Sequence, residues 1–159
     1  MRYLTVGDVI AFNRAEVVGD ALADFGLLES AVLRPQTTIG GLDAYPSVHE
    51  KAAALMHSLI RNHPFVDGNK RTAVVATFTF YMLNGWEVRA EDAEVVGLAI
   101  DVAEGHLDVA AIAKRIAGWA TRLELPEAYT SGALRAVRAA LGRGSKESGR
   151  VAPLTCRRR

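Results

Sequence analysis

The chain is organised around nine residues, His63-Pro64-Phe65-Val66-Asp67-Gly68-Asn69-Lys70-Arg71. They combine a titratable base, a carboxylate, a glycine, an amide and two cations, and they precede a long apolar segment that is typical of a helix. Gly68 permits backbone conformations closed to other residues. Successive N–H groups at such a turn form a hollow lined with donors at the positive end of the helix dipole. The stretch therefore predicts a phosphate site.

The side chains of the stretch suit phosphate chemistry. Lys70 offers a point charge and Arg71 a planar fork for phosphate oxygens. Two cations in the first turn oppose the helix dipole unless an anion binds between them. Histidine titrates near neutral pH and is the side chain best suited to take a proton from a hydroxyl. We therefore predict that His63 is the catalytic base. Asp67, a hard oxygen ligand, is the predicted ligand for Mg²⁺. The predicted phosphate- or nucleotide-binding residues are Gly68, Asn69, Lys70 and Arg71.

Each residue also has a simpler interpretation. His63 could cap the end of a helix, where cations are favoured. Asp67 could be a turn or N-cap aspartate, and Asn69 could be only an N-cap. The ordered string favours the catalytic interpretation over these single-residue ones. His49 and His57 are too far apart for an i, i+4 metal pair, so we expect both to be solvent-facing or structural.

The string resembles the Fic/Doc family signature His-x-Phe-x-(Asp/Glu)-(Gly/Ala)-Asn-(Gly/Lys)-Arg, and the match is closest to the Doc (death-on-curing) branch, which reads Asn-Lys-Arg. The resemblance covers roughly residues 3 to 122. Other stretches that look like that branch are Gly26-Leu27-Leu28-Glu29-Ser30-Ala31, Arg34-Pro35, Tyr45-Pro46, Glu50-Lys51-Ala52-Ala53 and Asn62.

The resemblance implies an enzyme: a toxin of a toxin-antitoxin module that transfers phosphate from ATP, with Mg²⁺, to a Ser or Thr hydroxyl of a protein target. In Doc-type toxins that target is translation elongation factor Tu. The family's AMP-transferring branch carries Gly at the position of Lys70 and a second Arg where this chain has Val74. Protein adenylylation is therefore the alternative. A second alternative is a non-catalytic module that binds an antitoxin or a nucleotide.

Many Fic proteins are inhibited by a helix bearing Ser/Thr-x-x-x-Glu-(Gly/Asn). Glu104-Gly105 is close to this string, but Ile100 stands where the hydroxyl should be. The resemblance therefore implies inhibition in trans by a Phd-like antitoxin, whose disordered segment folds into the cleft.

Helix start and stop signals predict an all-α fold: a compact single-domain bundle of about six helices. The segment after Asn69 has no charged residue from 72 to 86, so we expect it to form the central buried helix. Trp86-Glu87-Val88 could be a short extended piece. The expected helices begin after Thr5, near Gly26, after Ser47, at Asn69, near Glu91 and after Asp108, the last reaching Leu123.

Residues 36–46 contain Gly40-Gly41 and Pro46, which predict a loop or a short hairpin. In the family, the corresponding segment is a flap beside the catalytic cleft that orients the backbone of the target. The resemblance therefore implies the same position for this segment.

The composition is that of a globular protein. We expect one Fic/Doc-like domain at 1–125, a possible extra helix at 126–142 and a basic disordered tail at 143–159. The net charge of +1 gives no general attraction to nucleic acid or membrane. The longest uncharged run, 72–86, is shorter than the roughly 18 residues of a membrane span. A single cysteine and the absence of a signal pattern predict a cytoplasmic protein.

Overall fold

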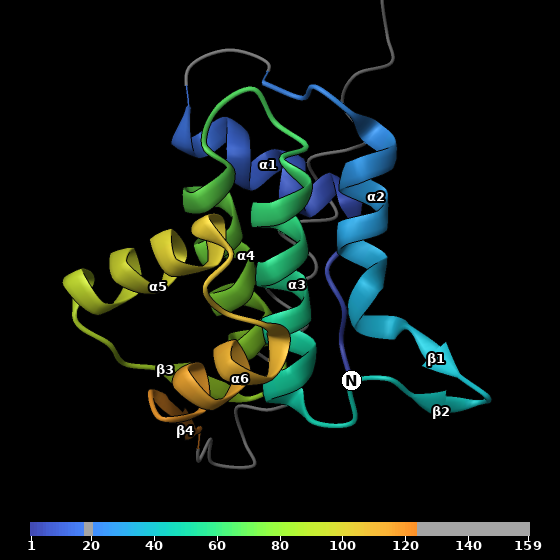
Figure 1. Ribbon diagram of the computed structural model, residues 1–159, viewed down its shortest axis with the longest axis vertical. Helices are drawn as coiled ribbons and strands as arrows, with labels where there is room; N and C mark the ends of the chain where they lie inside the picture. Colours follow the sequence, from blue (N-terminus) through green and yellow to red (C-terminus); the bar gives the residue numbers. More distant parts are fainter. Residues whose placement is uncertain (18–20, 124–159) are drawn as a thin grey trace, which may run out of the picture. The chain divides into compact units, whose positions relative to one another are not determined.

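The computed structural model (Figure 1) contains six α-helices and two small antiparallel strand pairs in its described residues, 1–17 and 21–123. The expected mostly helical fold is confirmed. The extra helix expected at 126–142 and the tail at 143–159 lie outside the described residues. The elements are α1 (Val6–Glu16), α2 (Phe25–Leu33), a 3-10 turn η1 (Arg34–Gln36), β1 (Thr38–Ile39), β2 (Leu42–Asp43), α3 (Val48–Asn62), α4 (Asn69–Leu83), β3 (Trp86–Val88), α5 (Asp92–Glu104), α6 (Val109–Ala117) and β4 (Ala120–Arg122).

Local side chains fix the helix ends. Thr5 and Ser47 each form a reciprocal capping box at the start of α1 and α3. Asp108 caps α6 by accepting a hydrogen bond from the Ala111 N–H (2.8 Å). Such caps each stabilise a helix by about 1 kcal/mol. Gly105 ends α5 in the left-handed conformation that glycine adopts most easily.

Helix α3 is the central buried helix of the fold (Figure 1). It packs against α2, η1, α4, α5 and α6. The sequence predicts this role for the helix after Asn69, and that assignment is wrong: in α4, Met82 is 65% exposed and Val74 and Val75 are half-buried. The difference arises because α3 buries polar residues as well as apolar ones. Its Lys51 Nζ donates to the Pro35 carbonyl (3.0 Å) and pairs with the Asp43 carboxylate (2.9 Å).

The last helix is shorter than expected. Helix α6 ends at Ala117, and the following residues form β4, which pairs antiparallel with β3. The expected extension of this helix to Leu123 is therefore wrong, because the Leu123 N–H donates to the Gly85 carbonyl (2.9 Å) and the Arg89 N–H donates to the Trp119 carbonyl (2.9 Å). These bonds between distant residues outweigh the local helical periodicity.

The expected hairpin exists, but it is not beside the predicted site. Strands β1 and β2 pair across Gly40 and Gly41, both of which have positive φ, as a tight hairpin turn requires. The hairpin precedes the first residue of α3, whereas His63 follows the last, and a helix of this length spans about 22 Å. Figure 1 shows the two at opposite ends of α3. The expectation of a flap beside the cleft is therefore wrong for this hairpin.

A different segment lies against the predicted site. Leu22 forms an isolated antiparallel bridge with Phe65. The Ala23 N–H donates to the Pro64 carbonyl (2.8 Å), and the Val66 N–H donates to the Ala21 carbonyl (2.6 Å). Residues 21–24 thus support the 64–66 backbone from one side.

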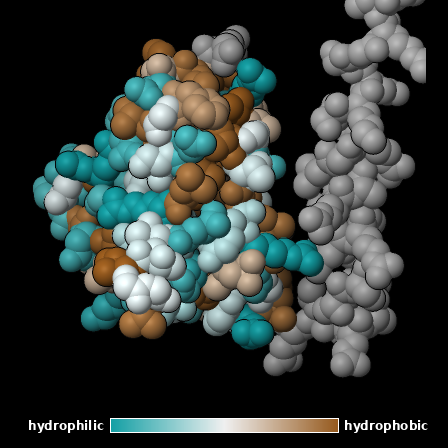
Figure 2. All heavy atoms as spheres, turned by 90° about the vertical axis from the view of Figure 1, so that its right-hand side faces the viewer, coloured by the Kyte–Doolittle hydropathy of each residue, from teal (hydrophilic) through white to brown (hydrophobic). Residues whose placement is uncertain are grey.

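The molecular surface on the side of α2 and the hairpin carries apolar patches among polar ones (Figure 2). Phe25, Leu33, Ile39 and Leu42 are exposed large apolar residues of these elements. None of the helices in the described ranges has both the length and the apolar character needed to cross a membrane.

Candidate active site

Asn69 pins the turn between α3 and α4. Its Oδ1 accepts from the Phe65 N–H (3.0 Å), and its Nδ2 donates to the Phe65 carbonyl (2.7 Å). Phe65 is buried, and Asn69 is only 5% exposed. The side-chain amide is therefore occupied inside the protein. Because of this, the group of Asn69 that remains for the predicted phosphate contact is its backbone N–H.

Gly68 is the N-cap of α4 and has φ +80°. A Cβ at this position would lie 2.8 Å from Val17 Cγ1 and 2.9 Å from Asn13 Nδ2. The first backbone hydrogen bond of the helix runs from the Thr72 N–H to the Gly68 carbonyl (2.8 Å). The N–H groups of residues 69–71 lie before it, at the positive end of the helix dipole, where orphan donors bind anions.

His63 ends α3 in the left-handed region (φ 51°, ψ 52°), the one non-glycine residue in the described ranges with positive φ. Its Nδ1 lies 3.0 Å from the Ile60 carbonyl oxygen. A carbonyl can only accept, so Nδ1 carries a proton, and in the neutral imidazole Nε2 is then the nitrogen with the lone pair. That tautomer is the one a general base needs.

One pocket of about 140 Å³ collects the predicted site residues. It is lined by His63, Val66, Asp67, Gly68, Asn69, Lys70 and Arg71. The hollow that the sequence predicts above the turn is therefore present, with the imidazole at its edge.

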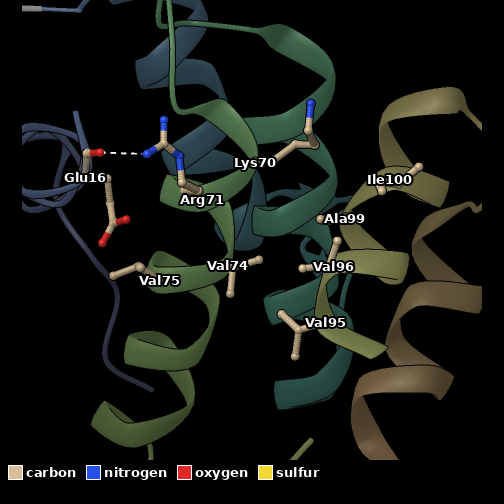
Figure 3. Close-up of a pocket in the computed structure, with 9 residues that line it drawn as sticks. All are labelled: Glu16, Lys70, Arg71, Val74, Val75, Val95, Val96, Ala99 and Ile100. Atoms are coloured by element: carbon tan, nitrogen blue, oxygen red, sulfur yellow. Dashed lines mark hydrogen bonds between the residues drawn. The ribbon is translucent and has the colours of Figure 1, made fainter. Parts of the chain in front are cut away.

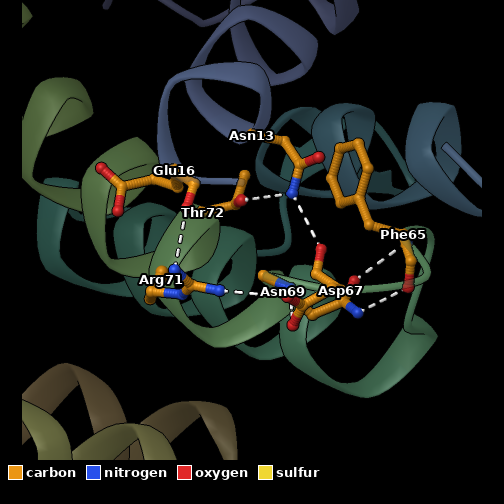
Figure 4. Close-up of polar contacts among 8 residues, drawn as sticks. Asn13, Glu16, Phe65, Asp67, Asn69, Arg71 and Thr72 are labelled. Atoms are coloured by element: carbon orange, nitrogen blue, oxygen red, sulfur yellow. Dashed lines mark hydrogen bonds and ion pairs between the residues drawn. The ribbon is translucent and has the colours of Figure 1, made fainter. Parts of the chain in front are cut away.

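Asp67 and Arg71 form an exposed ion pair (Figure 4). Asp67 Oδ2 lies 3.2 Å from Arg71 Nη2, and the two side chains are 73% and 53% exposed. Asp67 Oδ1 accepts from the Gly68 N–H (2.6 Å), and Arg71 Nη1 donates to the Glu16 carbonyl (2.8 Å). Exposed pairs contribute little to stability, so both groups can turn to a charged ligand at small cost.

A second pocket, of about 370 Å³, is larger than the first (Figure 3). Lys70 and Arg71 line both pockets. Most of the remaining wall is apolar and comes from α4 and α5. The lining residues are Glu16, Lys70, Arg71, Val74, Val75, Val95, Val96, Ala99 and Ile100. We call this second pocket the apolar groove.

Asn13 is a site residue that sequence reasoning missed. It is 1% exposed, and its Nδ2 donates to the Asp67 carbonyl (3.0 Å) and to Thr72 Oγ1 (2.9 Å). The available signal was an amide four residues after Val9, on the inward face of α1. Nothing local links it to Asp67, which is far away in the sequence.

Among the described residues that line the pocket, the one carboxylate, that of Asp67, is of a type that fits a magnesium ion bound together with a polyphosphate. In the described ranges, no three His, Cys, Asp or Glu side chains gather into a metal site. Mg²⁺ needs no such cage, because it is commonly held by one or two carboxylates together with substrate phosphates and water. The exposed carboxylate of Asp67 lines the pocket of the turn and has the chemistry of such a ligand.

Comparison with known proteins agrees with the motif. A model of the Fic/DOC family matches residues 3–81. Toxin Doc of Mycolicibacterium smegmatis (strain ATCC 700084 / mc(2)155) is 44% identical over 126 residues, which cover 74% of this chain and 93% of that protein. Protein kinase doc of Escherichia phage P1 is 26% identical over 117 residues, which cover 71% of this chain and 91% of that protein.

Proposed function

This chain belongs to the Fic/Doc family, in its Doc branch, and we propose that it is a toxin that transfers the γ-phosphate of ATP to a serine or threonine hydroxyl of a protein. The observation that carries the proposal is the shared pocket of His63 and the phosphate turn, with Nδ1 of the imidazole, and not Nε2, hydrogen-bonded to the Ile60 carbonyl. A base beside an anion hollow fits the deprotonation of an alcohol that attacks a phosphate.

In the proposed reaction, the target hydroxyl attacks the γ-phosphorus of ATP. A new oxygen–phosphorus bond forms, the bond to the β,γ-bridging oxygen breaks, and ADP leaves. His63 Nε2 takes the proton of the hydroxyl. Positioning and charge stabilisation supply most of the rate in such reactions, because the transition state needs little covalent help.

The rest of the pocket holds the polyphosphate. The N–H groups of residues 69–71 and the side chains of Lys70 and Arg71 would bind its oxygens. Asp67 would hold Mg²⁺, whose charge offsets that of the phosphates. Arg71 leaves its ion pair with Asp67 when each meets its own ligand.

The second turn of α4 favours transfer of the γ-phosphate over transfer of AMP. The AMP-transferring branch of the family has an Arg where this chain has Val74. Val74 lines the apolar groove with Val75 and Val95, so no cation follows Arg71 along that wall. The negative charge of an outgoing pyrophosphate would therefore meet little positive charge along that wall. Lys70, on the first turn, likewise favours transfer of the γ-phosphate, because the AMP-transferring branch carries Gly at that position.

For the target, we propose translation elongation factor Tu, which the resemblance to Doc-type toxins implies. The inhibitor would be a Phd-like antitoxin acting in trans, since Ile100 replaces the hydroxyl of the family's internal inhibitory string. Both proteins would be met in the cytoplasm.

The test is transfer of radiolabel from ATP. Purified protein is incubated with Mg²⁺, elongation factor Tu or a cell lysate, and ATP labelled at either the γ or the α position. We expect protein-bound label from γ-labelled ATP alone. Label from the α position alone would reject phosphate transfer in favour of adenylylation, and no label from either would favour a non-catalytic binding module.

A further inference from the structure

The last turn of α1 forms one wall of the phosphate turn. Glu16 offers its carbonyl to Arg71, and Asn13 reaches the backbone of Asp67 (Figure 4). Val17 lies where a side chain at Gly68 would have to go. The end of α1 and the residue that follows it therefore touch the turn at three positions, and of these only Asn13 does so through a side-chain hydrogen-bond donor.

Both hydrogen-bond donors of the Asn13 amide are committed. Buried amides require partners, and both protons of Nδ2 are used, one by the Asp67 carbonyl and one by Thr72 Oγ1. Because the carbonyl can only accept, the atom that faces it must be Nδ2 and not Oδ1. The orientation of the amide is thereby fixed by its partner.

The bond to the Asp67 carbonyl fixes a peptide plane. In a planar trans peptide, the C=O of one residue and the N–H of the next point in opposite directions. With the Asp67 oxygen held toward Asn13, the Gly68 N–H is directed away, where it donates to Asp67 Oδ1 (2.6 Å). That bond sets the orientation of the carboxylate. A rotated 67–68 peptide would release the carboxylate and misdirect the amides that follow.

We propose that Asn13 is a positioning residue for the nucleotide site: it holds the Asp67–Gly68 peptide so that the Asp67 carboxylate meets Mg²⁺ and the N–H groups of residues 69–71 meet phosphate. The proposal rests on the proposed function insofar as a Mg²⁺-bound nucleotide occupies this pocket. It adds a residue from α1, outside the motif, to the groups that determine metal affinity.

The two hydrogen bonds of Asn13 allow positioning to be separated from simple packing. Asn13 makes two hydrogen bonds, and only one of them goes to Asp67. Thr72→Val removes the other bond and leaves the peptide held. Asn13→Leu removes both bonds but keeps a branched, neutral side chain, and Asn13→Ala removes the side chain as well. A packing role predicts similar effects from Thr72→Val and Asn13→Leu, whereas a positioning role predicts different ones.

The matched control is Asn84, another amide that bonds backbone groups. Its Nδ2 donates to the Arg2 and Phe80 carbonyls (2.9 and 2.8 Å), at the other end of α4. The experiment is calorimetric titration of the full chain with the non-hydrolysable ATP analogue adenylyl imidodiphosphate, with Mg²⁺ and with EDTA. The thermal midpoint of each variant is recorded to confirm folding.

We expect Asn13→Leu and Asn13→Ala to weaken binding of the Mg²⁺-bound analogue by at least about tenfold, as loss of an outer-shell partner does at metal sites. Binding in EDTA should fall by much less, and Thr72→Val and Asn84→Ala should leave the Mg²⁺ dependence unchanged. Equal losses in Asn13→Leu and Asn84→Ala would overturn the proposal, as would wild-type affinity independent of Mg²⁺.

Failure of this proposal differs from failure of the proposed function. If the wild type transfers γ-label and Asn13→Leu binds the Mg²⁺-bound analogue as tightly as the wild type does, only the positioning role is rejected. If the wild type binds the Mg²⁺-bound analogue but transfers no label, and Asn13→Leu loses that binding, only the proposed phosphate transfer is rejected.

Discussion

Two histidines stand at opposite ends of α3, and their surroundings differ completely. At the first end, His49 Nδ1 lies 2.9 Å from the Tyr81 hydroxyl, and its ring packs edge-on against Trp86 with centroids 4.9 Å apart. At the other end, His63 Nδ1 donates to the Ile60 carbonyl, and the ring borders a polar pocket. Both use Nδ1, but the pocket beside His63 is also lined by the charged residues Asp67, Lys70 and Arg71.

The comparison teaches that the neighbours of a histidine determine its use. The partner of His49 is a tyrosine whose pKa is raised by burial, so that the hydroxyl stays neutral and the pair is a structural hydrogen bond. The neighbours of His63 are Asp67, Lys70 and Arg71, which can hold a polyphosphate beside the base. The same residue type therefore serves packing at one end of the helix and, we propose, chemistry at the other.

The sharpest way to break the comparison is to remove each imidazole in turn. We expect His63→Ala to lower the rate of label transfer by about 10²- to 10⁴-fold, the usual contribution of a general base. His49→Ala should transfer label at close to the wild-type rate at a temperature where it is folded. Growth arrest on expression gives an independent readout. Equal toxicity of wild type and His63→Ala would mean that catalysis is not the function.

The phosphate turn itself can be broken at Gly68. Gly68→Ala places a Cβ against Val17 and Asn13 and forces a left-handed residue, which costs about 1–2 kcal/mol before the clash is counted. We expect nucleotide binding to be lost and unfolding in urea to shift to lower denaturant. Gly85→Ala is the control: its φ is +81°, but nothing lies within 4 Å of the added Cβ. Equal losses of nucleotide binding in the two variants would show that the clash of the added Cβ with Val17 and Asn13 is not the cause.

At the other end of α3, His49→Ala should act on stability. It leaves the fully buried Tyr81 hydroxyl without its partner, which costs about 1–3 kcal/mol, and it also removes the ring from Trp86. Urea unfolding measures the loss. In His49→Ala/Tyr81→Phe, the unpaired hydroxyl is gone, so the double variant should be more stable than the sum of the two single changes predicts. Strict additivity would contradict the hydrogen bond.

The smallest effect should come from His57, in the middle of the same helix. Burial lowers its pKa, and the guanidinium groups of Arg34 and Arg61 lower it further. The unfolded chain then binds more protons than the folded one, so stability is complete above the unfolded pKa, near ~6.5, and declines as the pH falls below it. His57→Gln should flatten this decline in pH-dependent urea unfolding. An unchanged slope would exclude His57 as its source.

The parts of the molecule that could be predicted from sequence are those built from neighbours in the chain. The capping boxes at Thr5 and Ser47 and the turn from His63 to Arg71 all depend on residues a few positions apart. A helix dipole and a run of donors follow from such short stretches.

The parts that could not be predicted depend on distant partners. Asn13 meets Asp67 only because α1 packs against α4. Residues 120–122 become a strand only because β3 offers them an edge. The burial of α3 could not be predicted because the helix contains Lys51, and a charged residue predicts exposure. Its partners, the Pro35 carbonyl and the Asp43 carboxylate, are distant in sequence and are known only from the structure. The position of the hairpin likewise follows from tertiary contacts and not from its glycines.

The most direct test of the central claim is mass spectrometry of elongation factor Tu after incubation with Mg²⁺, ATP and wild-type, His63→Ala or His49→Ala protein. We expect a mass increase of one phosphoryl group on a Ser or Thr with wild type and with His49→Ala, and none with His63→Ala. A phosphoryl increment of equal yield with His63→Ala, or an adenylyl increment with wild type, would contradict the claim.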